Sequence, residues 1–172
     1  GVMFRRVKSA TIYGLDAQIV SVEVDVGNGL PIFEMSGYLA GEVKESKERI
    51  KVAIRNSGYE LKPQRIVVNI SPADIRKDGT GFDLPIAAGI LSANCIIDED
   101  RLEGVFVIGE LSLDGSVNPI TGILPMVCAA AESGFNTCIV PEANVKEAAM
   151  VAGIKVIGVD SLKAFIDIIN DL

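Results

Sequence analysis

The residues best placed to do chemistry lie in one short loop, KDGTG, at positions 77–81. This loop combines an amine in Lys77, a carboxylate in Asp78 and a hydroxyl in Thr80. The run FDLPIAAGILSAN follows it, with Pro85 where the first turn of a buried helix would lose no backbone donor. A hydroxyl with an amine base can be a nucleophile, and glycines before a helix can hold an anion with backbone amides. The same glycines can also serve only to form a tight turn.

Composition removes several classes of site. The chain has no histidine, which excludes His-dependent triads, His bases and nearly all transition-metal sites. Three cysteines, Cys95, Cys128 and Cys138, lie far apart in apolar surroundings and lack CxxC spacing. We therefore expect buried, reduced thiols in a cytoplasmic protein, without disulfides or zinc. No apolar run approaches the ~20 residues that span a membrane, so no membrane partner is expected.

The net charge of −7 is unevenly distributed. Residues 1–80 carry 12 basic and 10 acidic side chains, whereas residues 81–172 carry 4 and 13. Any contact with nucleic acid must therefore use the first half of the chain. The candidate DNA contacts are Arg5, Arg6 and Lys8 at the start, and Lys44, Lys47, Lys51 and Arg55 at helical spacing. Glutamates alternate with this second group, so an ion-paired, solvated helix face is the competing interpretation.

Hydrophobic periodicity predicts the elements that hold the loop. Two strands, 7–14 and 16–27, turn at Gly14, and a third at 31–36 returns to complete an antiparallel meander with one wet face. A helix is expected over 41–58, a central strand over 65–70 and a buried helix over 82–94. The second half alternates strands and helices, which is typical of a parallel βαβ section. The predicted class is α/β, or mixed α+β, with helices packed on a mixed sheet.

Three stretches carry a family resemblance. They begin TIYGLDAQIVSVEVDVGNG, VKESKERIKVAIRNSG and GELSLDGSVNPITGIL, and they follow one another in this order. Together they resemble the N-terminal domain of the Mg-chelatase-like AAA+ ATPases, the ComM or YifB group. The resemblance covers nearly all of residues 3–172, and Gly1-Val2 are expected to be a cloning remnant. It implies an ATPase module after Leu172, because no Walker A pattern occurs in this chain.

That domain in turn looks like the proteolytic domain of Lon proteases, and the same fold is implied. PITGIL (119–124) and PEAN (141–144) carry this second likeness. In Lon-type proteases a serine attacks the peptide carbonyl, and a lysine on the next helix is its base. Here Gly81 takes the nucleophile position and Leu124 the base position, and residues 122–132 contain no Lys, Arg or His. Thr80 is left as a weak candidate nucleophile without a base.

The resemblance implies a non-catalytic interaction or scaffold domain of a DNA-acting motor. The family is implied to form hexameric, ATP-driven branch-migration helicases in natural transformation. No cofactor is expected in this domain, with ATP and Mg²⁺ used by the parent protein. The implied partners are other subunits of a homo-oligomeric ring and branched or single-stranded DNA. Two alternatives stay open: a stand-alone peptidase using Thr80, and a phosphate or nucleotide site in the Lys77–Gly81 loop.

Overall fold

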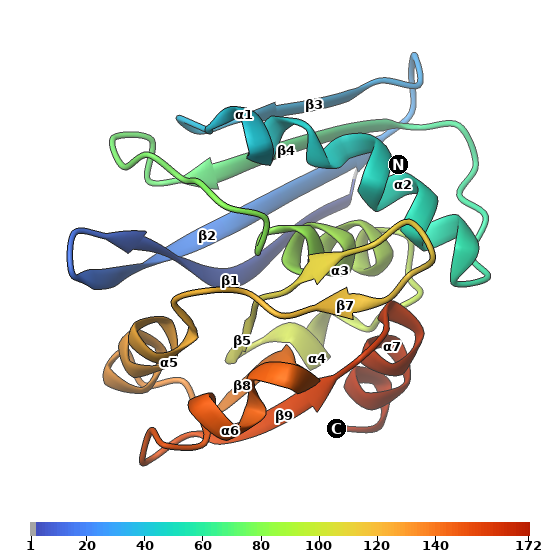
Figure 1. Ribbon diagram of the computed structural model, residues 1–172. Coiled ribbons are helices and arrows are strands. Elements are labelled where there is room, and N and C mark those ends of the chain that lie inside the picture. Colours follow the sequence, from blue (N-terminus) through green and yellow to red (C-terminus); the bar gives the residue numbers. More distant parts are fainter. Residues whose placement is uncertain (1–2) are drawn as a thin grey trace.

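The computed structural model describes residues 3–172, so the expected remnant Gly1-Val2 lies outside the described residues. Its centre is a seven-stranded mixed sheet in the order β3-β4-β2-β1-β5-β8-β9 (Figure 1). β1 (Met3–Tyr13) and β2 (Asp16–Gly27) form a long antiparallel hairpin. Gly14, with φ 67°, makes the two-residue turn that this pairing requires. The predicted mixed α/β class and the first hairpin are confirmed.

The third predicted strand does not complete a meander. β3 (Phe33–Ser36) lies parallel to β4 (Arg65–Ser71), and β4 lies between β3 and β2. The prediction of an antiparallel meander was therefore wrong at its third strand. β4 is the more apolar strand, with Ile66, Val68 and Ile70 buried, and it takes the central place beside β2. β3 is left at the edge of the sheet, at the top of Figure 1.

Helices cover both faces of the sheet. α3 (Asp83–Ala93) is buried along its whole length and packs on one face of β1 and β2, against Val7 and Val24. Gly89 permits this approach, because a Cβ there would lie 2.5 Å from Val24 Cγ2. α5 (Ile123–Glu132) packs with Ala10, which lies on the opposite face because side chains alternate along a strand. α7 (Leu162–Asp171) joins the cluster on the α3 side.

The long helix predicted over 41–58 is divided in two. α1 (Gly41–Lys44) ends at Glu45, and α2 (Ser46–Asn56) continues beside α3. The Ser46 hydroxyl donates to the Val43 carbonyl oxygen at 2.7 Å, so a side chain bonds the backbone at the break. The predicted apolar face is confirmed, since Val43, Ile50 and Ile54 are buried.

The second half supplies the rest of the sheet. β5 (Val105–Val107), β8 (Thr137–Pro141) and β9 (Lys155–Val159) are parallel, as the alternation predicted. A separate hairpin of β6 (Glu110–Leu111) and β7 (Val117–Asn118) follows β5. The shorter helical elements are α4 (Glu99–Leu102), η1 (Glu142–Asn144) and α6 (Val145–Ala148).

The expectation of three buried cysteines was wrong for two of them. Cys138 is buried in β8, but Cys128 is only partly buried and Cys95 is exposed. Cys95 follows the end of α3 and has a left-handed φ of 63°. This is the position at which chains commonly turn away from a helix end, so the side chain leaves the core.

Candidate functional site

The loop at 77–81 opens onto a pocket of about 260 Å³ between α3, the β6–β7 hairpin and the start of α5. α3 packs on one face of β1 and α5 packs on the other. The N-terminal end of α3 and the turn before α5 therefore both reach this pocket. The pocket is lined by Ala10, Ile12, Asp78, Gly79, Thr80, Gly81, Phe82, Ile108, Glu110, Pro119, Ile120, Thr121 and Met126. Its walls are thus largely apolar, and its titratable side chains are both carboxylates.

The Thr80 hydroxyl is held by a carboxylate. It donates a hydrogen bond to Glu110 Oε2, and Asn118 Nδ2 donates to Glu110 Oε1 at 3.1 Å. Glu110 and Asn118 are directly opposite each other in the β6–β7 hairpin, so the hairpin pairing positions this network. Asn118 Nδ2 also donates to Ser112 Oγ at 2.6 Å. Thr80 therefore has its hydrogen bond satisfied by an acid and not by an amine.

Lys77 points away from the pocket. Its side chain is fully buried (0% exposed), and Nζ donates to the carbonyl oxygen of Gly37 at 2.6 Å and to that of Pro72. Burial lowers the pKa of the Lys77 ammonium, and the charge of Asp74 acts in the opposite direction. Lys77 thus ties its loop to two other segments, and its amine does not line the pocket.

Gly81, which the Lon resemblance places at the nucleophile position, is closely packed. Leu124, which it places at the base position, does not line the pocket. A Cβ at Gly81 would lie 2.9 Å from Ile108 Cγ1 and 3.1 Å from Cδ1, so a larger residue there must move Ile108. Leu124 is half-buried in the first turn of α5 and is not among the pocket-lining residues. Neither position brings a nucleophile or a base to the pocket.

Three carboxylates lie around the loop, and one of them, that of Asp78, pairs with Arg76 at 3.4 Å. The Gly79 N–H donates to Glu42 Oε1 at 3.1 Å, and this bond lowers the pKa of the Glu42 carboxyl. Asp78 and Glu110 line the pocket, and no lysine or arginine is among its lining residues. A bound phosphate would face these carboxylates, and the amide of Gly79 is already engaged.

A buried ion pair anchors the α3 end of the site. Arg49 Nε and Nη2 donate to Asp83 Oδ2 and Oδ1 at 2.7 and 2.9 Å, and the Leu111 N–H donates to Oδ2 at 2.9 Å. Burial raises the pKa of the Asp83 carboxyl, while the bonds from Arg49 and Leu111 oppose the rise. The bond to Asp83 raises the pKa of Arg49. Asp83 thus joins α2, α3 and β6 and does not face the pocket.

The first group of candidate DNA contacts is largely engaged within the protein. Arg5 Nε donates to Ser92 Oγ at 3.0 Å, and Arg5 Nη1 lies 3.5 Å from Glu99 Oε2. Arg6 pairs with Glu23 at 3.3 Å and lies over the Phe4 ring at 5.3 Å. Arg5, Arg6 and Lys8 line a hollow of about 380 Å³ together with three acidic residues of the 99–103 segment. This hollow therefore carries both signs of charge.

The second group lies on α1 and α2 and is more accessible. Lys44, Lys51 and Arg55 are exposed and Lys47 is half-buried. Lys51 Nζ lies 3.5 Å from Glu48 Oε1. Such an exposed pair contributes little energy, so Lys51 is free to exchange partners. No residue of this group lines the hollow around Arg5, Arg6 and Lys8.

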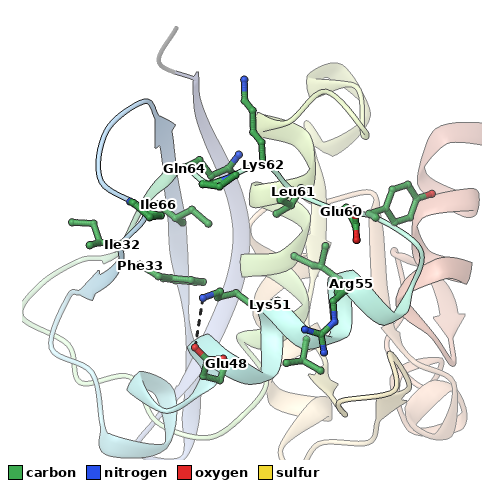
Figure 2. Close-up of a pocket in the computed structure, with 15 residues that line it drawn as sticks. Ile32, Phe33, Glu48, Lys51, Arg55, Glu60, Leu61, Lys62, Gln64 and Ile66 are labelled. Atoms are coloured by element: carbon green, nitrogen blue, oxygen red, sulfur yellow. Dashed lines mark ion pairs between the residues drawn. The ribbon is translucent and has the colours of Figure 1, made fainter.

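Sequence reasoning missed a larger groove of about 620 Å³ beside β3 (Figure 2). It lies between α2, the segment 59–64 and the strands β3 and β4. The signal was the apolar stretch Leu30-Pro31-Ile32, whose three residues are all exposed. It also missed Arg49 as the partner of Asp83 and Glu110 as the partner of Thr80, because these contacts join residues 34 and 30 positions apart.

Two further properties of residues 3–172 bear on the kind of site. No group of three or more Cys, Asp or Glu side chains in this range is arranged to hold a metal ion. Across the same described part, none of the helices has the length and apolarity needed to cross a membrane.

Comparison with known proteins gives the family. The family model for subunit ChlI of Mg-chelatase matches residues 22–144, which is more than half of the chain. The chain therefore belongs to this family. It is 36% identical over 146 residues to the competence protein ComM of Haemophilus influenzae, and 35% identical over 151 residues to the uncharacterized protein YifB of Escherichia coli. These alignments cover 85% and 88% of this chain.

A more distant relative is a protease. Lon protease 2 of Bacillus subtilis is 33% identical over 129 residues, which is 75% of this chain. The chain spans only 28% of ComM, 30% of YifB and 22% of Lon protease 2. It is a domain of the ComM/YifB Mg-chelatase-like family, and the resemblance stated from its motifs is confirmed.

Proposed function

We propose that this domain is a non-catalytic interaction module of a Mg-chelatase-like ATPase that acts on DNA. The supporting observation is the partner of Thr80: its hydroxyl bonds the Glu110 carboxylate, and no amine lines the pocket. A carboxylate is a much weaker base than a neutral amine, so it does not activate a hydroxyl as a lysine does. With Gly81 and Leu124 at the former catalytic positions, the pocket lacks both a nucleophile and its base.

We further propose that the domain has the fold of the Lon proteolytic domain. The similarity to Lon protease 2 covers three quarters of the chain. In this proposal the domain has an ancestral peptidase fold whose surfaces now serve to bind partners. The parent protein is a cytoplasmic ring of identical subunits that uses ATP and Mg²⁺ in a module outside this chain.

A reactive probe tests the absence of peptidase chemistry. The purified chain is incubated with a fluorophosphonate that labels activated hydroxyls, and the products are mapped by mass spectrometry. We expect no labelling of Thr80 above that of a denatured sample. Labelling of Thr80 that is lost in Thr80→Val would contradict the proposal and favour the peptidase alternative.

The proposed DNA contact is the exposed cationic face of α1 and α2. Lys44 and Lys51 are exposed and Lys47 is half-buried, and replacing all three with glutamate should weaken salt-sensitive binding to branched DNA. A matched control replaces Lys146, Lys155 and Lys163, which are exposed on α6, β9 and α7, with glutamate. Equal binding by the parent and the α1–α2 variant would show that this face is not the contact.

A phosphate or nucleotide site at residues 77–81 is the weaker proposal. Lys77 is turned away, and Asp78, Glu42 and Glu110 surround the loop. Calorimetry with ATP, GTP and inorganic phosphate should therefore give no heat of binding at millimolar ligand. A saturable signal that Gly79→Ala abolishes would reinstate the site.

A further inference from the structure

The groove beside β3 is a second surface, separate from the pocket at residues 77–81. With a volume of about 620 Å³, it is the largest of the described hollows. Figure 2 shows Ile32, Phe33 and Ile66 on one side of it and Glu48 and Lys51 of α2 on the other, with Arg55 farther along α2. Lys62 and Gln64 come from the segment that closes one end. We call this surface the β3 groove.

Apolar side chains line the inside of the β3 groove. Phe33, Leu61 and Ile66 pack against the main core and keep part of their surface in the groove. Ile32 is 38% exposed at its mouth, and Leu30, two residues earlier, is 78% exposed. Apolar groups that stay open to water in this way gain free energy when another apolar group covers them.

Two of the three cations that line the groove have no ion-pair partner within residues 3–172. Lys51 is paired with Glu48, but no carboxylate within residues 3–172 forms an ion pair with Arg55 or Lys62. The one further carboxylate that lines the groove is that of Glu60. With three cations and two carboxylates, the lining of the groove has a small net positive charge in a chain whose net charge is −7. Its charge is complementary to that of an acidic ligand.

The strand beside the groove has a free edge. β3 pairs with β4 on one side, and no strand of the described chain pairs with its other side. Ile32 O accepts from the Ile66 N–H at 2.8 Å, so Ile32 turns its backbone toward β4. Since these groups alternate along a parallel ladder, the N–H and C=O of Phe33 and Met35 face outward. An open edge of this kind accepts an added strand.

We propose that the β3 groove binds an extended partner segment in which apolar and acidic residues alternate. The segment adds to the edge of β3, places its apolar side chains beside Phe33 and Ile32, and directs carboxylates to Arg55 and Lys62. The volume suits about two or three side chains of such a segment.

This proposal rests on the proposed function in one respect, namely that the domain has a binding partner. Its failure would leave the absence of peptidase chemistry untouched, because the groove and the Thr80 pocket share no lining residue.

The test uses a fluorescein-labelled peptide, Gly-Asp-Ile-Asp-Val-Asp-Ile-Asp, and a counterpart with lysine in place of every aspartate. Fluorescence polarisation should show saturable binding of the acidic peptide and none of the basic one. The double variant Arg55→Glu/Lys62→Glu should weaken binding about tenfold or more. The matched control is Lys146→Glu/Lys163→Glu, which makes the same charge change on α6 and α7 and should leave binding unchanged.

Hydrogen exchange locates the bound peptide. Exchange of the Phe33 and Met35 amides should slow in the complex, as expected for strand addition. The proposal is overturned if the acidic peptide does not bind saturably, or if the control variant weakens binding as much as the groove variant. It is also overturned if the peptide slows amide exchange at another surface and not in β3. It is also overturned if the chain self-associates in sedimentation and Ile32→Asp abolishes that association, because the occupant would then be a second copy.

Discussion

The hydroxyl of Thr80 donates its hydrogen bond to the carboxylate of Glu110, which the β6–β7 hairpin holds in place through Asn118. A hydroxyl-and-amine peptidase would instead need an amine at this hydroxyl. No lysine or arginine lines the pocket that holds this hydroxyl. The consequences are testable at Gly81, Lys77 and Arg49 around the site, and at the cysteines elsewhere in the fold.

The crowding at Gly81 predicts that this position accepts no side chain without cost. In Gly81→Ala the new methyl would meet Ile108 at 2.9 Å, so we expect a loss of about 2 kcal/mol of unfolding free energy. Urea denaturation measures the loss. Gly41→Ala is the matched control, because a Cβ there meets nothing within 4 Å. In an Ile108→Ala background the cost of Gly81→Ala should disappear, and a cost that persists would refute the contact as its cause.

Lys77 should be a structural residue whose contribution grows with pH. Lys77→Met would leave the Gly37 and Pro72 carbonyl oxygens without this donor, at a cost of about 2 kcal/mol or more. Burial lowers the pKa of Lys77 in the folded chain. As pH rises toward the ordinary lysine pKa, the folded chain therefore loses this proton before the unfolded chain does, and folding becomes more favourable. The stability difference between the parent and Lys77→Met should therefore widen from pH 7 to pH 10. A constant difference would show that the amine is not desolvated.

Arg49 should compensate the buried charge of Asp83. Asp83 is 1% exposed, so Arg49→Gln leaves a carboxylate without its ionic partner, at a cost of about 3 kcal/mol. The pKa of Asp83 is already raised by burial and should rise further in the variant. At pH values just below this raised pKa, the folded variant holds a proton that the unfolded chain has lost. The stability of the variant should therefore fall as pH rises through the raised pKa of Asp83. Thermal melts at pH 5 and pH 7 should show the smaller deficit at pH 5, and equal deficits would contradict this.

The cysteines should differ sharply in reactivity. Burial raises the pKa of the Cys138 thiol to about 11, and its side chain is inaccessible in β8. Cys95 is exposed, so iodoacetamide at pH 8 should label it first and should label Cys138 only after unfolding. Peptide mass spectrometry distinguishes the sites. Labelling of Cys138 at the rate of Cys95 in the folded chain would show that β8 opens readily.

The sequence predicted the elements whose pattern is local. Alternating valines at 20, 22, 24 and 26 indicated β2, and the unbroken apolar run after Asp83 indicated a helix buried on all sides. It did not predict the partner of β3, because strand order depends on which strand best fills the centre of the sheet. It did not predict the direction of Lys77 either, since the two carbonyl groups that receive its amine come from residues 37 and 72.

For the candidate site, too, local features could be predicted from the sequence and long-range contacts could not. Motifs alone suggested Gly81 and Leu124 as degenerate catalytic positions, and this assignment stays a prediction. The bond between Thr80 and Glu110 joins residues 30 positions apart and required the fold. The β3 groove is built from three separate segments, and only the exposed apolar residues 30–32 hinted at it.

The central claim is that the domain binds without cutting. Its most direct test is incubation of the purified chain with unfolded casein at neutral pH, followed by mass spectrometry of any new peptide termini. We predict no cleavage above that of the Thr80→Val variant prepared in parallel. Reproducible cleavage by the parent chain that Thr80→Val abolishes would contradict the account.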